Sequence, residues 1–140
     1  MANSQNSTVT YHAVSQDAAE AVIAAGMTSA KEIGSPISIA VVDPGGWLVS
    51  FRRMDKGVAG GVDGAIEKAR SSAKFQSSLA DFEKLADKQS YIGNLPGLIP
   101  LGGAEPLTVD GEFVGAVAVS GATEDVEQKV AEAAAKHFNS

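Results

Sequence analysis

Residues 37–54, with the sequence ISIAVVDPGGWLVSFRRM, decide the fold of this chain. The apolar and largely β-branched run over 37–42 predicts a buried strand, and the DPGG sequence after it supplies the proline and glycine of a tight turn. A second strand-like run follows, so these residues predict a β-hairpin. Side chains alternate along a strand, which puts Arg52 and Arg53 on opposite faces of the sheet. One of the two arginines can therefore face a pocket.

A second hairpin is predicted near the carboxyl end of the chain. Residues 107–109 and 112–120 resemble strands, and the Asp110-Gly111 pair between them is a strong turn signal. Residues 9–14 are read either as a short additional strand or as an extended arm. Residues 1–8 are polar and predict a disordered tail, which leaves a single domain over 9–139.

The first helix is predicted by a stripe of small apolar residues over 19–33. Ser15 or Asp17 can cap its beginning, and Gly34 ends it. Glycines across 57–64 predict a loop before the second helix.

Two more helices are predicted after Ser78 and after Thr123. Between them, proline and glycine interrupt residues 91–106, yet this segment carries Leu95, Leu98 and Ile99, which is typical of a functional or interface loop. Consecutive strands form hairpins, so the sheet is expected to be antiparallel with helices flanking it, an α+β arrangement.

Composition narrows the functions that this chain can have. Its 140 residues suit one domain, and 11 basic against 17 acidic residues give a net charge of −6, which disfavours nucleic acid and anionic membranes as partners. The absence of cysteine rules out thiolate chemistry, and two histidines cannot build a three-histidine metal centre. No apolar run is long enough for membrane insertion, so a cytoplasmic protein is expected, although a secreted precursor with its leader removed would look the same.

The histidines are the first candidates for chemistry, since imidazole ligates haem iron and moves protons near neutral pH. His137 shares an apolar helical stripe, which predicts a packed residue. His12 precedes the first helix among polar neighbours and is either an ordinary surface residue or a ligand, including a metal ligand.

Charged residues near glycine-rich segments are the second group of candidates. Lys68 or Arg53 can hold a carboxylate, and Glu105 or Asp55 can act as a general base, which makes Lys68, Glu105 and Asp55 the candidate catalytic residues. The alternative reading is that these are solvated surface charges.

Several ordered motifs resemble one known family, and together they span most of residues 9–137. They are VVDPGG at 41–46, FRRMD at 51–55, EKAR at 67–70, GGAEP at 102–106 and GAVAVSG at 115–121. This pattern is similar to the GlcG/HbpS-type haem-binding and haem-degrading family, which is related to the C-terminal domain of PduO-type cobalamin adenosyltransferases.

The resemblance implies a profilin-like, three-layer α/β/α fold with a five-stranded antiparallel sheet, assembled as a homo-oligomer and often an octamer. It implies haem as the cofactor, with a role in haem degradation or in iron and redox sensing. The first helix contains no histidine, which leaves His12 as the nearest axial ligand. The matched residues expected near the cofactor, beside His12, are Asp43, Arg53, Gly102 and Gly103.

Three functions remain open on the sequence. The first is an oligomeric haem or tetrapyrrole binder, with the apolar loop residues around the ring, Lys68 or Arg53 on the propionates and His12 on the iron. The second is a protein or enzyme for a small organic acid, of the kind found in a glycolate-type catabolic operon, using a pocket of Lys, Arg and Glu. The third is a structural oligomer without a ligand.

Overall fold

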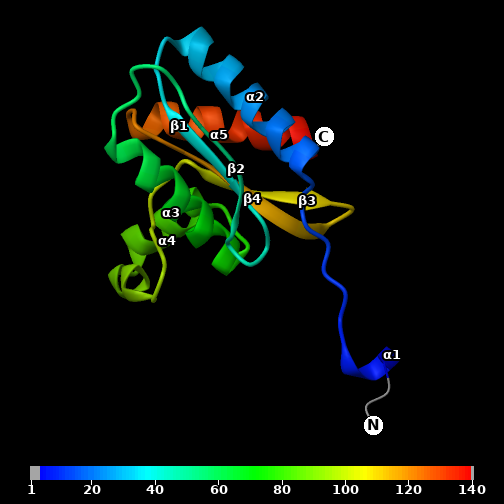
Figure 1. The fold of residues 1–140 in the computed structure, drawn as a ribbon. Coiled ribbons are helices and arrows are strands. Elements are labelled where there is room, and N and C mark those ends of the chain that lie inside the picture. The colour runs from blue at the N-terminus through cyan, green and yellow to red at the C-terminus, as the bar shows by residue number, and fades with distance from the viewer. Residues whose placement is uncertain (1–3, 140) are drawn as a thin grey trace.

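The structure, a computed structural model, describes residues 4–139 (Figure 1). Its main elements follow the predicted order of helix, hairpin, two helices, hairpin and helix. They are α1 (Ser4–Ser7), α2 (Gln16–Ile33), β1 (Ser38–Val42), β2 (Leu48–Arg53), α3 (Gly60–Phe75), α4 (Leu79–Lys88), the 3-10 helix η1 (Ser90–Asn94), β3 (Ala104–Val109), β4 (Glu112–Ser120) and α5 (Glu124–Asn139).

Four antiparallel strands form the sheet, in the spatial order β2-β1-β4-β3. Both predicted hairpins are confirmed, and β1 and β4 lie side by side at the centre. The helices lie on both faces. The side chains of Ile39 and Val41 pack with α2 and α5, whereas those of Ala40 and Val42 pack with α3 and α4. The predicted α+β class is therefore confirmed.

The prediction of a fifth strand is wrong. Residues 8–15 form neither helix nor strand, and the backbone contact of this segment with the sheet is one hydrogen bond, from Val14 N to Val114 O at 2.9 Å. Val14 is buried, but the residues before it are exposed, so a longer strand here would bury no apolar face. Figure 1 shows the segment running away from the body towards α1. The prediction of disorder over 1–8 covers residues 1–3, which lie outside the described residues, and it stays a prediction.

The predicted glycine loop over 57–64 is also partly wrong, because α3 already begins at Gly60. A Cβ atom on Gly61 would lie 2.9 Å from the carbonyl oxygen of Ser120, and one on Gly64 would collide with the Ser120 hydroxyl. These glycines let α3 approach the end of β4 closely. Their role is packing, and the sequence alone suggests flexibility instead.

The two edges of the sheet differ. On β3, Pro106 has no N–H to offer, its carbonyl accepts from the Asn139 side chain, and Asn139 in turn accepts from the backbone N–H of Thr108. The outer edge of β2 has no comparable cover from the residues that the structure describes. Within the same residues, no helix combines the length and the apolar character that a bilayer crossing requires.

Candidate functional site

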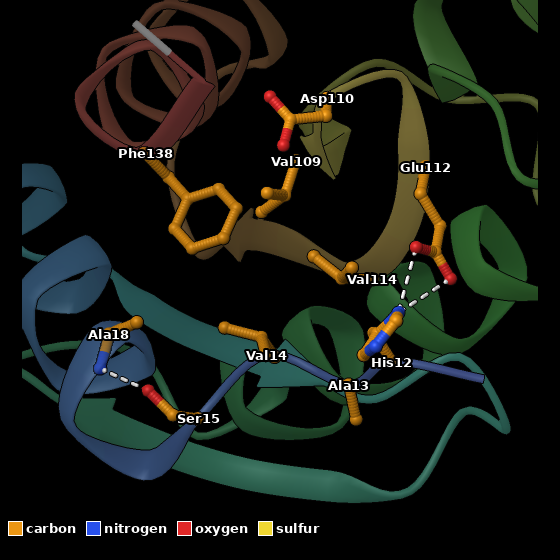
Figure 2. A pocket seen from close by; sticks show the side chains of 10 residues that line it. All are labelled: His12, Ala13, Val14, Ser15, Ala18, Val109, Asp110, Glu112, Val114 and Phe138. Atoms are coloured by element: carbon orange, nitrogen blue, oxygen red, sulfur yellow. Dashed lines mark hydrogen bonds and ion pairs between the residues drawn. The ribbon is translucent and has the colours of Figure 1, made fainter. Parts of the chain in front are cut away.

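A pocket of about 540 Å³ lies where the start of α2, the β3–β4 turn and the end of α5 meet (Figure 2). Its walls are mostly apolar, and Figure 2 shows His12 and Glu112 together at one side, with Asp110 and Ser15 at other places around it. The lining residues are His12, Ala13, Val14, Ser15, Ala18, Val109, Asp110, Glu112, Val114 and Phe138.

Two local interactions hold the segment that brings His12 to this pocket. The hydroxyl of Ser15 accepts a hydrogen bond from Ala18 N at 3.1 Å, which caps α2 and confirms the predicted cap. The bond from Val14 N to Val114 O then ties the same segment to β4. His12 therefore lies next to the first residues of β4.

His12 and Glu112 form a hydrogen-bonded pair at one side of the pocket. The His12 Nδ1 atom lies 2.9 Å from Glu112 Oε2 and 3.1 Å from Oε1 (Figure 2). This hydrogen bond lowers the pKa of the Glu112 carboxyl below its ordinary value. A carboxylate on Nδ1 fixes the tautomer and orientation of an imidazole and raises the basicity of Nε2. The arrangement thus presents Nε2 as a nitrogen ligand.

The charge of the pocket limits what it can hold. Apolar side chains from the segment before α2, from β4 and from α5 form its walls, namely Val14, Val114 and Phe138. Asp110 and Glu112 are the acidic groups of its lining, and neither Lys nor Arg is among the lining residues. An apolar ligand that offers a metal to an imidazole suits this site, whereas a ligand gripped by its carboxylates does not.

Lys68 lies in a second cluster, where α3 meets the end of β4. Its Nζ donates to Val119 O at 2.8 Å and lies 3.1 Å from Glu127 Oε1, with both side chains largely buried. Burial lowers the pKa of Lys68, and the nearby Glu127 carboxylate opposes that shift. The other oxygen of Glu127 accepts from the backbone of Gly121 and Ala122. The Lys68 cation is therefore engaged within the fold.

Comparisons with known proteins place the chain in a family. The family model described as haem degrading protein HbpS-like matches residues 14–136. The chain belongs to the HbpS-like family. Protein GlcG of Escherichia coli strain K12 is 37% identical to this HbpS-like chain over 108 residues, which cover 76% of the chain and 81% of GlcG.

Two solved structures agree with this assignment. The HbpS-like chain superposes on HbpS with a TM-score of 0.87 at 25% identity, covering 99% of this chain and 98% of HbpS. The PduOC:heme complex matches with a TM-score of 0.81 at 18% identity, covering 91% and 96% of the two chains, a likeness that shows the fold alone. The predicted resemblance to the GlcG/HbpS-type family is confirmed.

Gly102, Gly103 and Glu105 join the Lys68 cluster of this HbpS-like chain. Gly102 N donates to Glu83 Oε1 and Glu124 Oε1, both at 3.0 Å, and Gly103 lies against Lys68, where a Cβ would meet Nζ at 2.5 Å. Hydrogen bonding between the two carboxyls raises the pKa of Glu83 and lowers that of Glu124.

Glu105 is the least satisfied group of this cluster. Its Oε2 is buried and makes no hydrogen bond within the described part of the chain. Burial raises the pKa of the carboxyl, although Ser78 and Gln128 oppose the rise by hydrogen bonding.

The remaining sequence candidates lie apart from both places. Arg53 donates to Gly57 O from Nε at 3.0 Å and from Nη2 at 2.7 Å, which closes the loop after β2. Asp43 Oδ1 accepts from Gly45 N at 2.9 Å and Trp47 N at 3.0 Å, so it stabilises the β1–β2 turn. Asp55 is exposed and borders a small hollow beside Arg52. No contact among the described residues joins Asp55 to Lys68 or Glu105.

The structure thus brings Lys68, Gly102 and Gly103 together, and Gln128 hydrogen-bonds both Gly103 and Glu105. His12 lies apart from all of them. Sequence reasoning missed Glu112 as the partner of His12 and Phe138 as part of the pocket wall. The Asp110-Gly111 turn signal placed Glu112 at a strand start, but nothing local links residue 112 to residue 12. The apolar loop residues Leu95, Leu98 and Ile99, expected around a cofactor, are not among the lining residues of the His12 pocket.

Proposed function

We propose that this HbpS-like protein binds haem or a related tetrapyrrole in the pocket of Figure 2, with His12 Nε2 as the iron ligand. The observation that carries the proposal is the His12–Glu112 hydrogen bond at the mouth of an apolar pocket. Membership in a family described as haem degrading and likeness to a haem-bound neighbour support it.

The residues present fit such a group. The volume of about 540 Å³ lies within the usual range for small-ligand and cofactor sites. Val109, Val114 and Phe138 offer an apolar surface to a flat ring, and a carboxylate-supported imidazole is a common iron ligand. Haem, when bound, supplies an iron centre that can change oxidation state and bind small molecules.

The side chains of this chain would each have a defined task. Glu112 would orient the His12 ring by accepting a hydrogen bond from Nδ1, while the apolar walls would contact the flat ring of the ligand. Asp110 repels negative charge, so propionates would point away from the β3–β4 turn towards solvent or a neighbouring subunit. Lys68 and Arg53, the two residues expected to hold propionates, are bonded elsewhere in the fold.

A role in haem degradation or in iron and redox sensing, carried out by a homo-oligomer in the cytoplasm, is part of the same proposal. The family description supports the part of this role that concerns haem degradation, whereas the pocket supports binding. A small-acid enzyme has less support, because the Lys68 cation is paired with Glu127 and the Asp55 carboxylate lies apart. Whether a reaction follows binding depends on the ligand.

A haemin titration followed by absorbance tests the proposal. We expect saturable binding with a shifted Soret band, which weakens at least tenfold in His12→Ala and less in Glu112→Gln, because Gln can still accept from Nδ1. His137→Ala removes the other histidine, which borders a different groove between α2 and α5, and serves as the matched control. Equal binding by His12→Ala and the unmodified protein would exclude His12 as the ligand, and no binding at all would exclude the pocket.

A further inference from the structure

The segment before His12 has the composition of a strand, yet residues 9–11 pair with no strand in the described part of the chain. Residues 8–11 read Thr-Val-Thr-Tyr, four residue types that favour extended structure. Val9 and Tyr11 are each 76% exposed, and residues 9–11 make no backbone hydrogen bond with the described part of the chain. Figure 1 shows residues 8–11, which we call the arm, projecting from the body.

The sheet has one edge that can accept such a segment. Pro106 and Asn139 block the outer side of β3. On the opposite edge, Met54 N bonds to Ile37 O, so the alternation of an antiparallel ladder turns the backbone N–H and C=O groups of Phe51 and Arg53 outwards. An exposed strand edge of this kind is a template for pairing with another chain.

The charged residues of β2 disfavour some partners for its outer edge and favour others. Two copies of β2 meeting edge to edge would place Arg52 and Arg53 of both chains close together, which is unfavourable. The arm and the preceding α1, residues 4–11, carry no charged residue. The whole chain has a net charge of −6. An uncharged arm lets two acidic molecules meet without bringing like charges together.

We propose that the arm of one copy pairs antiparallel with the β2 edge of a second copy and adds a strand to that sheet. Val9 then lies opposite Arg53 and Tyr11 opposite Phe51, an aromatic cross-strand pair, while Thr10 faces Arg52 at a non-hydrogen-bonded position. The contact also restrains the neighbouring His12. This inference goes beyond the proposed function, and its tests use protein without haem.

Cysteine cross-linking tests the pairing directly, because the chain has no cysteine of its own. Protein with Thr10→Cys is mixed with protein with Arg52→Cys and oxidised. Opposite positions of a non-hydrogen-bonded pair suit a disulfide, so a dimer band that disappears on reduction is expected. Thr108→Cys on the blocked β3 edge replaces Arg52→Cys as the matched control and should leave the mixture uncross-linked.

Other cross-linking patterns would overturn the proposal. Dimers of Thr10→Cys alone at the rate of the mixture would mean that two arms pair together. Dimers of Arg52→Cys alone would mean that two β2 edges pair, and cross-linking to Thr108→Cys at an equal rate would mean random collision.

Sedimentation gives a second, independent test. The unmodified protein should have at least twice the 14.3 kDa of one chain, and Val9→Pro, which removes a ladder N–H, should lower that mass at least twofold. Thr10→Ser keeps every backbone donor and should leave the mass unchanged. A monomeric unmodified protein, or a Val9→Pro variant of unchanged mass, would refute the arm contact even if haem binds.

Discussion

Glu105 carries a buried carboxyl oxygen without a partner, and burial raises the pKa of this group. A raised pKa in the folded state means that folding favours the protonated carboxyl. The contribution of Glu105 to stability is therefore fully present below its ordinary pKa of 4.5. It is lost as the pH rises through the pKa of the folded state. Above that pH the buried carboxylate is poorly solvated, which disfavours the folded state.

The variant Glu105→Gln should therefore be more stable than the unmodified protein at neutral pH. We expect a gain of about 1 kcal/mol, or about 3 °C in Tm, because an amide removes the charge and keeps the shape. Thermal unfolding over a pH series measures the effect, which should vanish below pH 4.5. Glu32→Gln, an exposed carboxyl on α2, is the control. A loss of stability at neutral pH would show that the Glu105 carboxylate is needed in its ionised form.

At the scale of elements, the contact of α3 with the end of β4 depends on Gly61. Gly61→Ala should destabilise the protein by about 1–3 kcal/mol, because the new Cβ would meet the Ser120 carbonyl and the Gly121 backbone. Gly60→Ala is the matched control, since a Cβ there meets nothing within 4 Å, and it should be neutral or stabilising through helix propensity. Urea unfolding of both variants gives the comparison. Equal stability of the Gly61→Ala and Gly60→Ala variants would mean that α3 does not pack closely against the end of β4.

Local signals predicted the elements well, and distant contacts explain what they missed. The DPGG and Asp110-Gly111 turns, the Ser15 cap and the Gly34 helix end all act within a few residues, so the sequence alone indicates them. The start of α3 depends on Ser120, almost 60 positions away. The candidate site follows the same rule: His12 could be singled out, but its partner Glu112 is 100 residues distant.

At the scale of the whole molecule, an ion pair between Lys68 and Glu127 connects the helices on the two faces of the sheet. Lys68 belongs to α3 on one face of the sheet and Glu127 to α5 on the other, and the pair meets beside the end of β4. Removal of one partner from a buried ion pair leaves the other charge uncompensated. This single contact therefore couples the stability of both helical layers.

Lys68→Met should lower the free energy of unfolding by about 3 kcal/mol, because it leaves the largely buried Glu127 side chain without its cationic partner. Lys68→Met combined with Glu127→Gln should recover part of that loss, since Gln can still accept from Gly121 and Ala122. Denaturant unfolding of the single and double variants measures the coupling. Additive losses in the double variant would argue against the pair as the link between the layers.

The β1–β2 turn holds the only tryptophan of the chain, Trp47, which is 69% exposed with the Arg70 guanidinium 5.7 Å from its ring centre. A domain of this length has a radius of gyration of about 14 Å, so a porphyrin bound anywhere on it lies within range of resonance energy transfer from the indole. Trp47 also precedes β2, the edge to which the arm is assigned. The natural chain thus contains its own fluorophore: quenching reports the arrival of a porphyrin, and a change of emission wavelength reports the covering of the edge.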